Sequence, residues 1–267
     1  MKVRILNQVR RGFTLIEMVV VLVILAAIAA LVIPRLGFLK DQADSATAAA
    51  GAAQVASNLE TCKLTTGSYP LGMDSLLASG GTAVYSRLYT HTAGPTTFGL
   101  GVDITAGTIP ATTSTDRWGE SFGHSFQPNP SYYVYDHDAA SADPSNSGTV
   151  LRTFSSAGGK PVATVTGTSL LQAAGFPGGL PTDGSVMLIA FGVGPNTASV
   201  GTTMASAPRH TAQNEDSYGR YVAIFAIYKS GKSAELKTVV DSYGNSPDKN
   251  VSSFKKSSPS LPGAPTP

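Results

Sequence analysis

The feature that most constrains this fold is an unbroken apolar run near the N-terminus. Residues 13–33 read FTLIEMVVVLVILAAIAALVI, and Glu17 is the single charged residue among them. At about 1.5 Å per residue, a helix of this length covers about 31 Å, which is the thickness of a bilayer core. Its Leu, Ile, Val and Phe residues favour insertion by about 4 to 8 kcal/mol, more than the roughly 3 kcal/mol that one central carboxylate costs. The sequence therefore predicts a transmembrane helix over residues 13–33.

The segment before this run sets the predicted orientation. Residues 1–12 read MKVRILNQVRRG and carry four cations and no acid, which favours a cytoplasmic N-terminus and an outward-facing body. A cleaved secretory signal peptide is disfavoured, because its apolar core is shorter and ends at a small-x-small site. A plain membrane anchor would have no use for Glu17, whose carboxylate is costly in hydrocarbon.

Residues 10–17, RRGFTLIE, resemble the class III signal of type IV prepilins and type II secretion pseudopilins. The resemblance implies that a prepilin peptidase cleaves between Gly12 and Phe13, that the new Phe13 amine is N-methylated, and that the apolar helix is retained. It also implies that Glu17 neutralises the Phe13 amine of a neighbouring subunit during filament assembly. A carboxylate in hydrocarbon needs such a partner or a proton.

The helix is expected to continue beyond the membrane to residue 66. Pro34 is predicted to kink it, since proline removes one backbone hydrogen bond. Gly67 is the expected C-cap. Apolar and small residues recur at three- and four-residue steps along this second half, which is expected to pack on the body; the stripe consists of Leu36, Leu39, Ala43, Ala46, Ala50 and Ala53.

The rest of the chain is expected to form an antiparallel sheet. Predicted strands cover residues 132–135, 150–154, 186–191, 221–228 and 236–240, with a hairpin turn at 230–232 and a short helix at 168–174. The predicted fold class is α+β: a type IV pilin fold with a long N-terminal helix, membrane-spanning in its first half, packed on an antiparallel β-sheet. The domains would be a leader (1–12), the helix (13–66), the body (67–254) and a disordered Pro/Ser tail (255–267).

Two segments of the body also resemble the major pseudopilin of type II secretion. The helix of that family ends in a Gly-x-Tyr-Pro segment, which residues 67–70 match, and Asp74 is then expected to cap a short helix. Residues 116–122, DRWGESF, are similar to its Asp-Pro-Trp-Gly turn before the first strand, with Arg117 replacing proline. Trp118 is expected in the core.

No catalytic motif appears, so an enzyme is not expected. Cys62 has no base beside it and is predicted to be a buried thiol. Calcium is the one possible cofactor, with Asp136 and Asp138 as candidate ligands in a loop. The calcium loop of major pseudopilins does not carry over, since the corresponding residues after Phe191 contain no acid.

Charge argues against nucleic acid as a partner. The chain has 19 Lys+Arg and 17 Asp+Glu, and without the leader the 15 remaining cations give a slightly acidic protein. The predicted function is a filament subunit of a type II secretion or type IV pilus-like machine in the bacterial inner membrane, with a periplasmic body. Its expected partners are the prepilin peptidase, other pilin-like subunits and the inner-membrane assembly platform. An adhesin or DNA-uptake minor pilin, and a tethered binding domain with a pilin leader, stay open as alternatives.

Overall fold

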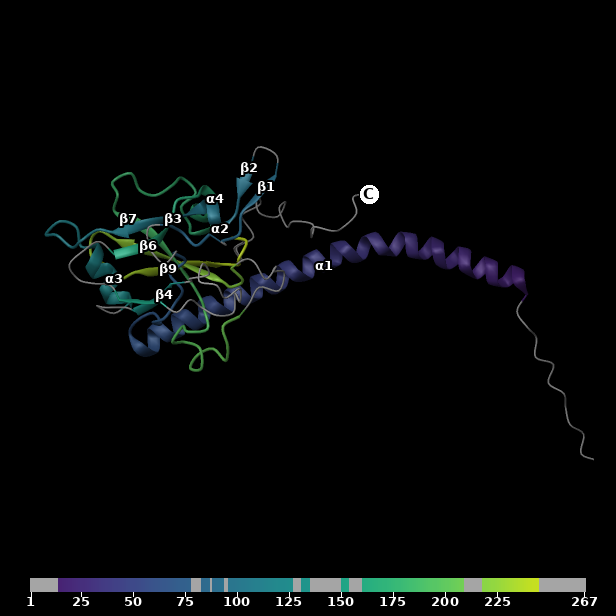
Figure 1. The fold of residues 1–267 in the computed structure, drawn as a ribbon, viewed down its shortest axis with the longest axis horizontal. Helices are drawn as coiled ribbons and strands as arrows, with labels where there is room; N and C mark the ends of the chain where they lie inside the picture. The colour runs from purple at the N-terminus through teal and green to yellow at the C-terminus, as the bar shows by residue number, and fades with distance from the viewer. Residues whose placement is uncertain are drawn as a thin grey trace, which may run out of the picture. The chain divides into compact units, whose positions relative to one another are not determined.

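The computed structural model describes residues 14–77, 83–86, 88–93, 96–126, 131–134, 150–153, 160–208 and 218–244 (Figure 1). The chain divides into two compact units, Met1–Asp44 and Ser45–Pro267. The leader, Phe13, the candidate calcium ligands Asp136 and Asp138, and the proposed tail lie outside the described residues.

A 52-residue helix, α1 (Leu15–Thr66), runs through both units. The helix continues through Pro34, which confirms the predicted continuation beyond the apolar run. A kink at that proline stays a prediction. The helix ends where expected, because Gly67 adopts a left-handed φ of 82° and donates its N–H to the Lys63 carbonyl at 2.8 Å. Among the described residues, no helix meets the length and apolarity required of a membrane span.

The body is built on a five-stranded antiparallel sheet, which confirms the predicted α+β class. The strand order is β3-β6-β7-β8-β9. Its members are β3 (Ile104–Ile109), β6 (Lys160–Val165), β7 (Val186–Gly192), β8 (Val222–Tyr228) and β9 (Glu235–Val240). Two separate pairs are β1 (His91–Ala93) with β2 (Thr96–Phe98), and β4 (Ser131–Val134) with β5 (Val150–Thr153). Three short helices complete the body: α2 (Leu100–Asp103), α3 (Trp118–Phe126) and α4 (Thr168–Ala173).

Both faces of the sheet are covered. Along β8, Phe225 and Ile227 join a core with α1 and α3, whereas Ile224 and Ala226 join a second core with α2 and α4. Figure 1 shows α2 and α4 on the opposite side of the sheet from the body end of α1. Burial on both faces explains why this strand is an unbroken apolar run instead of an alternating one.

The face that α1 turns toward the sheet differs from the predicted one. Ala52, Val55 and Leu59 are buried against the sheet, while the expected contact residues Ala46, Ala50 and Ala53 are exposed. An alanine-rich helix contains several small-residue stripes at helical spacing, and the larger Val55 and Leu59 decide which one is buried, because they remove more apolar surface from water.

Two turn-level predictions were wrong. Residues 118–126 form α3, not a turn before the first strand, and Trp118 and Phe122 point into the core from it. Asp74 caps no helix; it forms an isolated antiparallel bridge to Gly192. β3 and β6 went unpredicted because Gly107 interrupts the first (ITAGTI) and Pro161 the second (KPVATV), and both residue types are depleted in strands.

The other body predictions are confirmed. The five predicted strands correspond to β4, β5, β7, β8 and β9 within one residue wherever the structure describes them, and the predicted short helix is α4. The hairpin turn joins β8 to β9, with Gly231 at a φ of 80°. Trp118 and Cys62 are both buried, at 6% exposure each.

Candidate functional site

The N-terminus of α1 is closed by a reciprocal pair of side chains. Thr14 precedes the first helical residue and accepts the Glu17 N–H through its hydroxyl oxygen at 3.3 Å. Glu17 reaches back and accepts the Thr14 N–H through Oε2 at 2.8 Å, and the Thr14 hydroxyl at 3.0 Å. This is a capping box, which satisfies two backbone donors that a helix start otherwise leaves unpaired.

The capping box gives Glu17 a partner within its own helix. The prepilin resemblance implies another partner for this carboxylate, the Phe13 amine of a neighbouring subunit. The signal was present in the sequence, because Thr14-Leu15-Ile16-Glu17 is the T-x-x-E pattern ahead of an apolar run. Gly12 and Phe13, the predicted cleavage and methylation residues, lie outside the described residues.

The helix surface next to this cap is apolar all round. Every described side chain from residue 14 to 30 is exposed, and Leu15 and Ile16 reach 83% and 71%. A large exposed apolar surface of this kind marks contact with lipid or with another protein.

A second exposed surface runs along the body half of α1. Ala46, Ala50, Ala53 and Ser57 recur at three- and four-residue steps, and all four are exposed. Side chains this small let the backbone of another helix approach closely. We refer to these four residues as the small-residue stripe.

The end of α1 is tied to β9 through the hydroxyl of Tyr69. This hydroxyl donates to Glu60 Oε1 at 2.8 Å and accepts the Leu236 N–H at 2.8 Å and Lys63 Nζ at 3.2 Å. Lys63 also donates to the Ala234 carbonyl at 2.9 Å. Burial and the Glu60 carboxylate raise the pKa of Tyr69, so the hydroxyl stays protonated. The contacts fix the helix end to the sheet.

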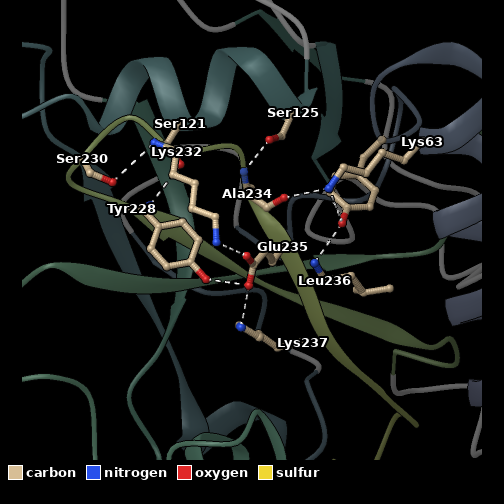
Figure 2. Close-up of polar contacts among 11 residues, drawn as sticks. Lys63, Ser121, Ser125, Tyr228, Ser230, Lys232, Ala234, Glu235, Leu236 and Lys237 are labelled. Carbon is tan, nitrogen blue, oxygen red and sulfur yellow. Dashed lines mark hydrogen bonds and ion pairs between the residues drawn. The ribbon is translucent and has the colours of Figure 1, made fainter.

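The hairpin between β8 and β9 is held by two serines of α3 and by hydrogen bonds to Glu235 within the hairpin. On α3, Ser121 accepts the Tyr228 N–H at 3.0 Å and Ser125 accepts the Ala234 N–H at 2.5 Å. Glu235 accepts from Lys232, from Lys237 at 2.8 Å and from Tyr228 at 2.7 Å, as Figure 2 shows.

These three donors, Lys232 first, lower the pKa of Glu235 to about 2. The carboxylate therefore stays ionised at neutral pH. Its charge is used in holding the hairpin, not in proton transfer.

The described residues offer no metal centre: among them no three His, Cys, Asp or Glu side chains come together in a way that would hold an ion. The calcium prediction at Asp136 and Asp138 therefore stays a prediction on residues outside the description. Cys62 is a buried free thiol on α1, and its Sγ lies 3.9 Å from the hydroxyl oxygen of Thr66.

Comparison with known proteins addresses the N-terminal segment first. Residues 7–33 match the family described as "Prokaryotic N-terminal methylation motif". The match covers the predicted cleavage site, the capping box and the apolar run.

A curated relative is similar over a longer stretch. The chain is 35% identical over 86 residues to "Type II secretion system core protein G" of Klebsiella michiganensis. The match covers 31% of this chain and 61% of the relative, so less than two thirds of that protein is represented. No solved structure matches the chain. The chain thus carries a prepilin-type N-methylation motif and is distantly similar to the major pseudopilin of type II secretion.

Proposed function

We propose that this protein is a filament subunit that a prepilin peptidase processes and that assembles through α1. The observation that carries the proposal is the N-terminal methylation motif at residues 7–33, which ends in an apolar helix that a secretory signal would discard. The similarity to core protein G favours a secretion pseudopilus over a type IV pilus.

Processing is proposed at the Gly12–Phe13 bond, followed by methylation of the Phe13 amine. The four leader cations hold the N-terminus in the cytoplasm, where the peptidase site would lie at the inner-membrane surface. Residues 13–33 then keep the subunit in the inner membrane, with the body in the periplasm.

Assembly would exchange one partner of Glu17 for another. In the free subunit the capping box supplies two hydrogen bonds to this carboxylate, so it need not be unpaired in the membrane. In the filament the methylated Phe13 amine of a neighbouring subunit would supply the opposite charge. Leaving either charge unpaired is expensive, so the pair fixes the register between subunits.

The exposed surfaces of α1 supply the packing. The apolar first half would leave lipid for the filament interior, and the small-residue stripe would let helices approach closely. A head-to-tail contact of this kind repeats without closing, which produces an open helical filament. The other subunits and the inner-membrane assembly platform are the proposed partners.

The decisive experiment follows the N-terminus and the assembly separately. The full chain is expressed with its secretion genes, with and without the prepilin peptidase, and the mature mass is measured. We expect an N-terminal methyl-Phe13 with the peptidase and an intact leader without it. A mature protein beginning at Met1 in the presence of the peptidase would overturn the proposal.

Assembly is then tested with Glu17→Ala, scored by filament isolation after cross-linking. The variant should be cleaved and methylated but absent from filaments. Asp183→Ala, an exposed carboxylate of the body, is the matched control and should assemble normally. Wild-type incorporation of the Glu17→Ala chain would refute the assigned role of this residue.

A further inference from the structure

Asp74 is a fully buried carboxylate with an incomplete set of partners. It lies in the segment that follows α1, at 0% exposure. The Tyr218 hydroxyl donates to its Oδ2 at 2.9 Å, while Oδ1 has no hydrogen-bond partner among the described residues. A buried ionised carboxylate in such a setting is costly, so the neutral acid is favoured.

One loop closes over this side chain. Asp74 and Gly192 exchange both backbone hydrogen bonds at 2.8 Å, and the Ala198 N–H donates to the Leu71 carbonyl at 2.8 Å. Gly194 lies directly against the carboxyl group of Asp74, since a Cβ at this position would lie 2.6 Å from Asp74 Cγ. Residues 192–204 therefore act as the cover of Asp74, and we call them the cover loop.

The polar and charged partners of Asp74 come from the segment before β8. Tyr218 and Arg220, both before β8, supply a hydrogen bond and a positive charge, and residues 192–199 of the cover loop carry no ionisable side chain. Desolvation outweighs both and raises the pKa of Asp74 to about 7. On the same side, the ring of Tyr85 lies 6.5 Å from that of Tyr218.

We propose that Asp74 is a proton-controlled latch: the neutral carboxyl keeps the cover loop closed, and loss of its proton favours an open loop in which water reaches the carboxylate. The proposal concerns the body alone and does not depend on filament assembly. Opening would also expose Val193 and Met204, two side chains of the cover loop that are buried in the closed state. The loop would thus expose apolar surface as the pH rises.

The direction follows from linkage. The carboxyl binds its proton more tightly when the loop is closed than when water reaches it. Closure is therefore most stable below the ordinary pKa of an aspartate, and it weakens as pH rises toward the closed-state pKa near 7. The opening constant should rise by about tenfold per pH unit between about pH 4 and 7 and then level off.

Hydrogen exchange measured on the full chain in detergent micelles tests the latch. After correction for intrinsic rates, the amides of Val193, Ala198 and Val200 should lose protection by about thirtyfold or more between pH 5 and 7. The amides of Ile224 and Phe225 in β8 should not change. Asp74→Asn should keep the cover loop protected at both pH values, and Asp183→Asn, on the surface, should behave like the wild type.

Three results would overturn the latch. One is equal loss of protection in β8, which would mean that the whole body opens. Another is protection of the cover loop that does not depend on pH in the wild type. The third is unchanged pH dependence in Asp74→Asn. Should that variant not fold, the carboxyl carbon of Asp74 can be titrated in the wild type by NMR, and a midpoint below about 5 rejects the proposal, since it is the ordinary range for aspartate.

Discussion

Gly51 lies directly against the ring of Tyr221: a Cβ built on this glycine would overlap the Tyr221 hydroxyl oxygen and lie 2.7 Å from Cζ. Glycine inside a helix costs about 1 kcal/mol relative to alanine. Here the absence of a Cβ allows α1 to approach Tyr221, the residue that precedes β8. Tyr221 is itself buried, at 3% exposure. From the sequence alone, Gly51 would only be expected to weaken the helix.

Gly51→Ala should therefore destabilise the body by about 1 to 3 kcal/mol despite the better helix propensity of alanine, because overpacking outweighs it. Chemical denaturation of the full chain in micelles measures the change. Ser57→Ala, on the exposed side of the same helix, should change the free energy of unfolding by no more than about 0.5 kcal/mol. A stabilised Gly51→Ala chain would show that Tyr221 moves aside at little cost.

Tyr69→Phe should cost about 1 to 3 kcal/mol, since the variant leaves Glu60, Lys63 and the Leu236 N–H without their shared hydroxyl. The ring itself stays, so its aromatic contacts with Phe126 and Phe225 are retained. Tyr228→Phe is the matched control. It removes one of three donors to the partly exposed Glu235 and should cost less than half as much. Equal losses in the two variants would contradict a special role for the Tyr69 hydroxyl.

Asp103 should make stability depend on pH. It is 7% exposed at the end of α2, packed so tightly that a Cβ on Gly167 would lie 2.5 Å from its own Cβ, and burial raises the pKa of Asp103 to about 6. The folded state binds this proton more tightly than the unfolded state, so its stabilising effect is complete below about pH 4 and is lost as pH rises through 6.

Asp103→Asn should consequently have a higher Tm than the wild type at pH 7.5 and the same Tm at pH 4. Thermal unfolding at the two pH values measures the difference, with Asp183→Asn as the control. A variant whose Tm differs from the wild type by the same amount at both pH values would exclude proton linkage at this site.

The two sides of α1 should respond differently to a larger side chain. Ala53→Leu changes the small-residue stripe and should leave the stability of the body within about 0.5 kcal/mol, yet block filament assembly. Ala52→Leu, one residue away, fills the interface with the sheet, where Ala52 is 1% exposed, and should destabilise the body by about 1 to 3 kcal/mol. Normal filaments from Ala53→Leu would remove the stripe from the assembly surface.

The sequence alone determined the N-terminal quarter of this protein, up to Gly67. The apolar run, its basic leader and Glu17 follow from local chemistry, as does the continuous helix to Gly67, because each depends on neighbours within one or two turns. The strongest strands, β7 and β8, were also visible, since burial on both faces requires unbroken apolar runs.

Only the tertiary structure decided which face of α1 is buried and what Asp74 and Gly51 do. The helix offers several small-residue stripes at helical spacing, and the one with Val55 and Leu59 is buried because these side chains pack against a sheet whose strands come from distant parts of the chain, from Ile104–Ile109 to Glu235–Val240. Asp74 looks like a helix cap in the sequence, and the cover loop and Tyr218 make it a buried acid instead. Contacts between distant segments set the burial of a group, and burial sets its charge and its conformational role.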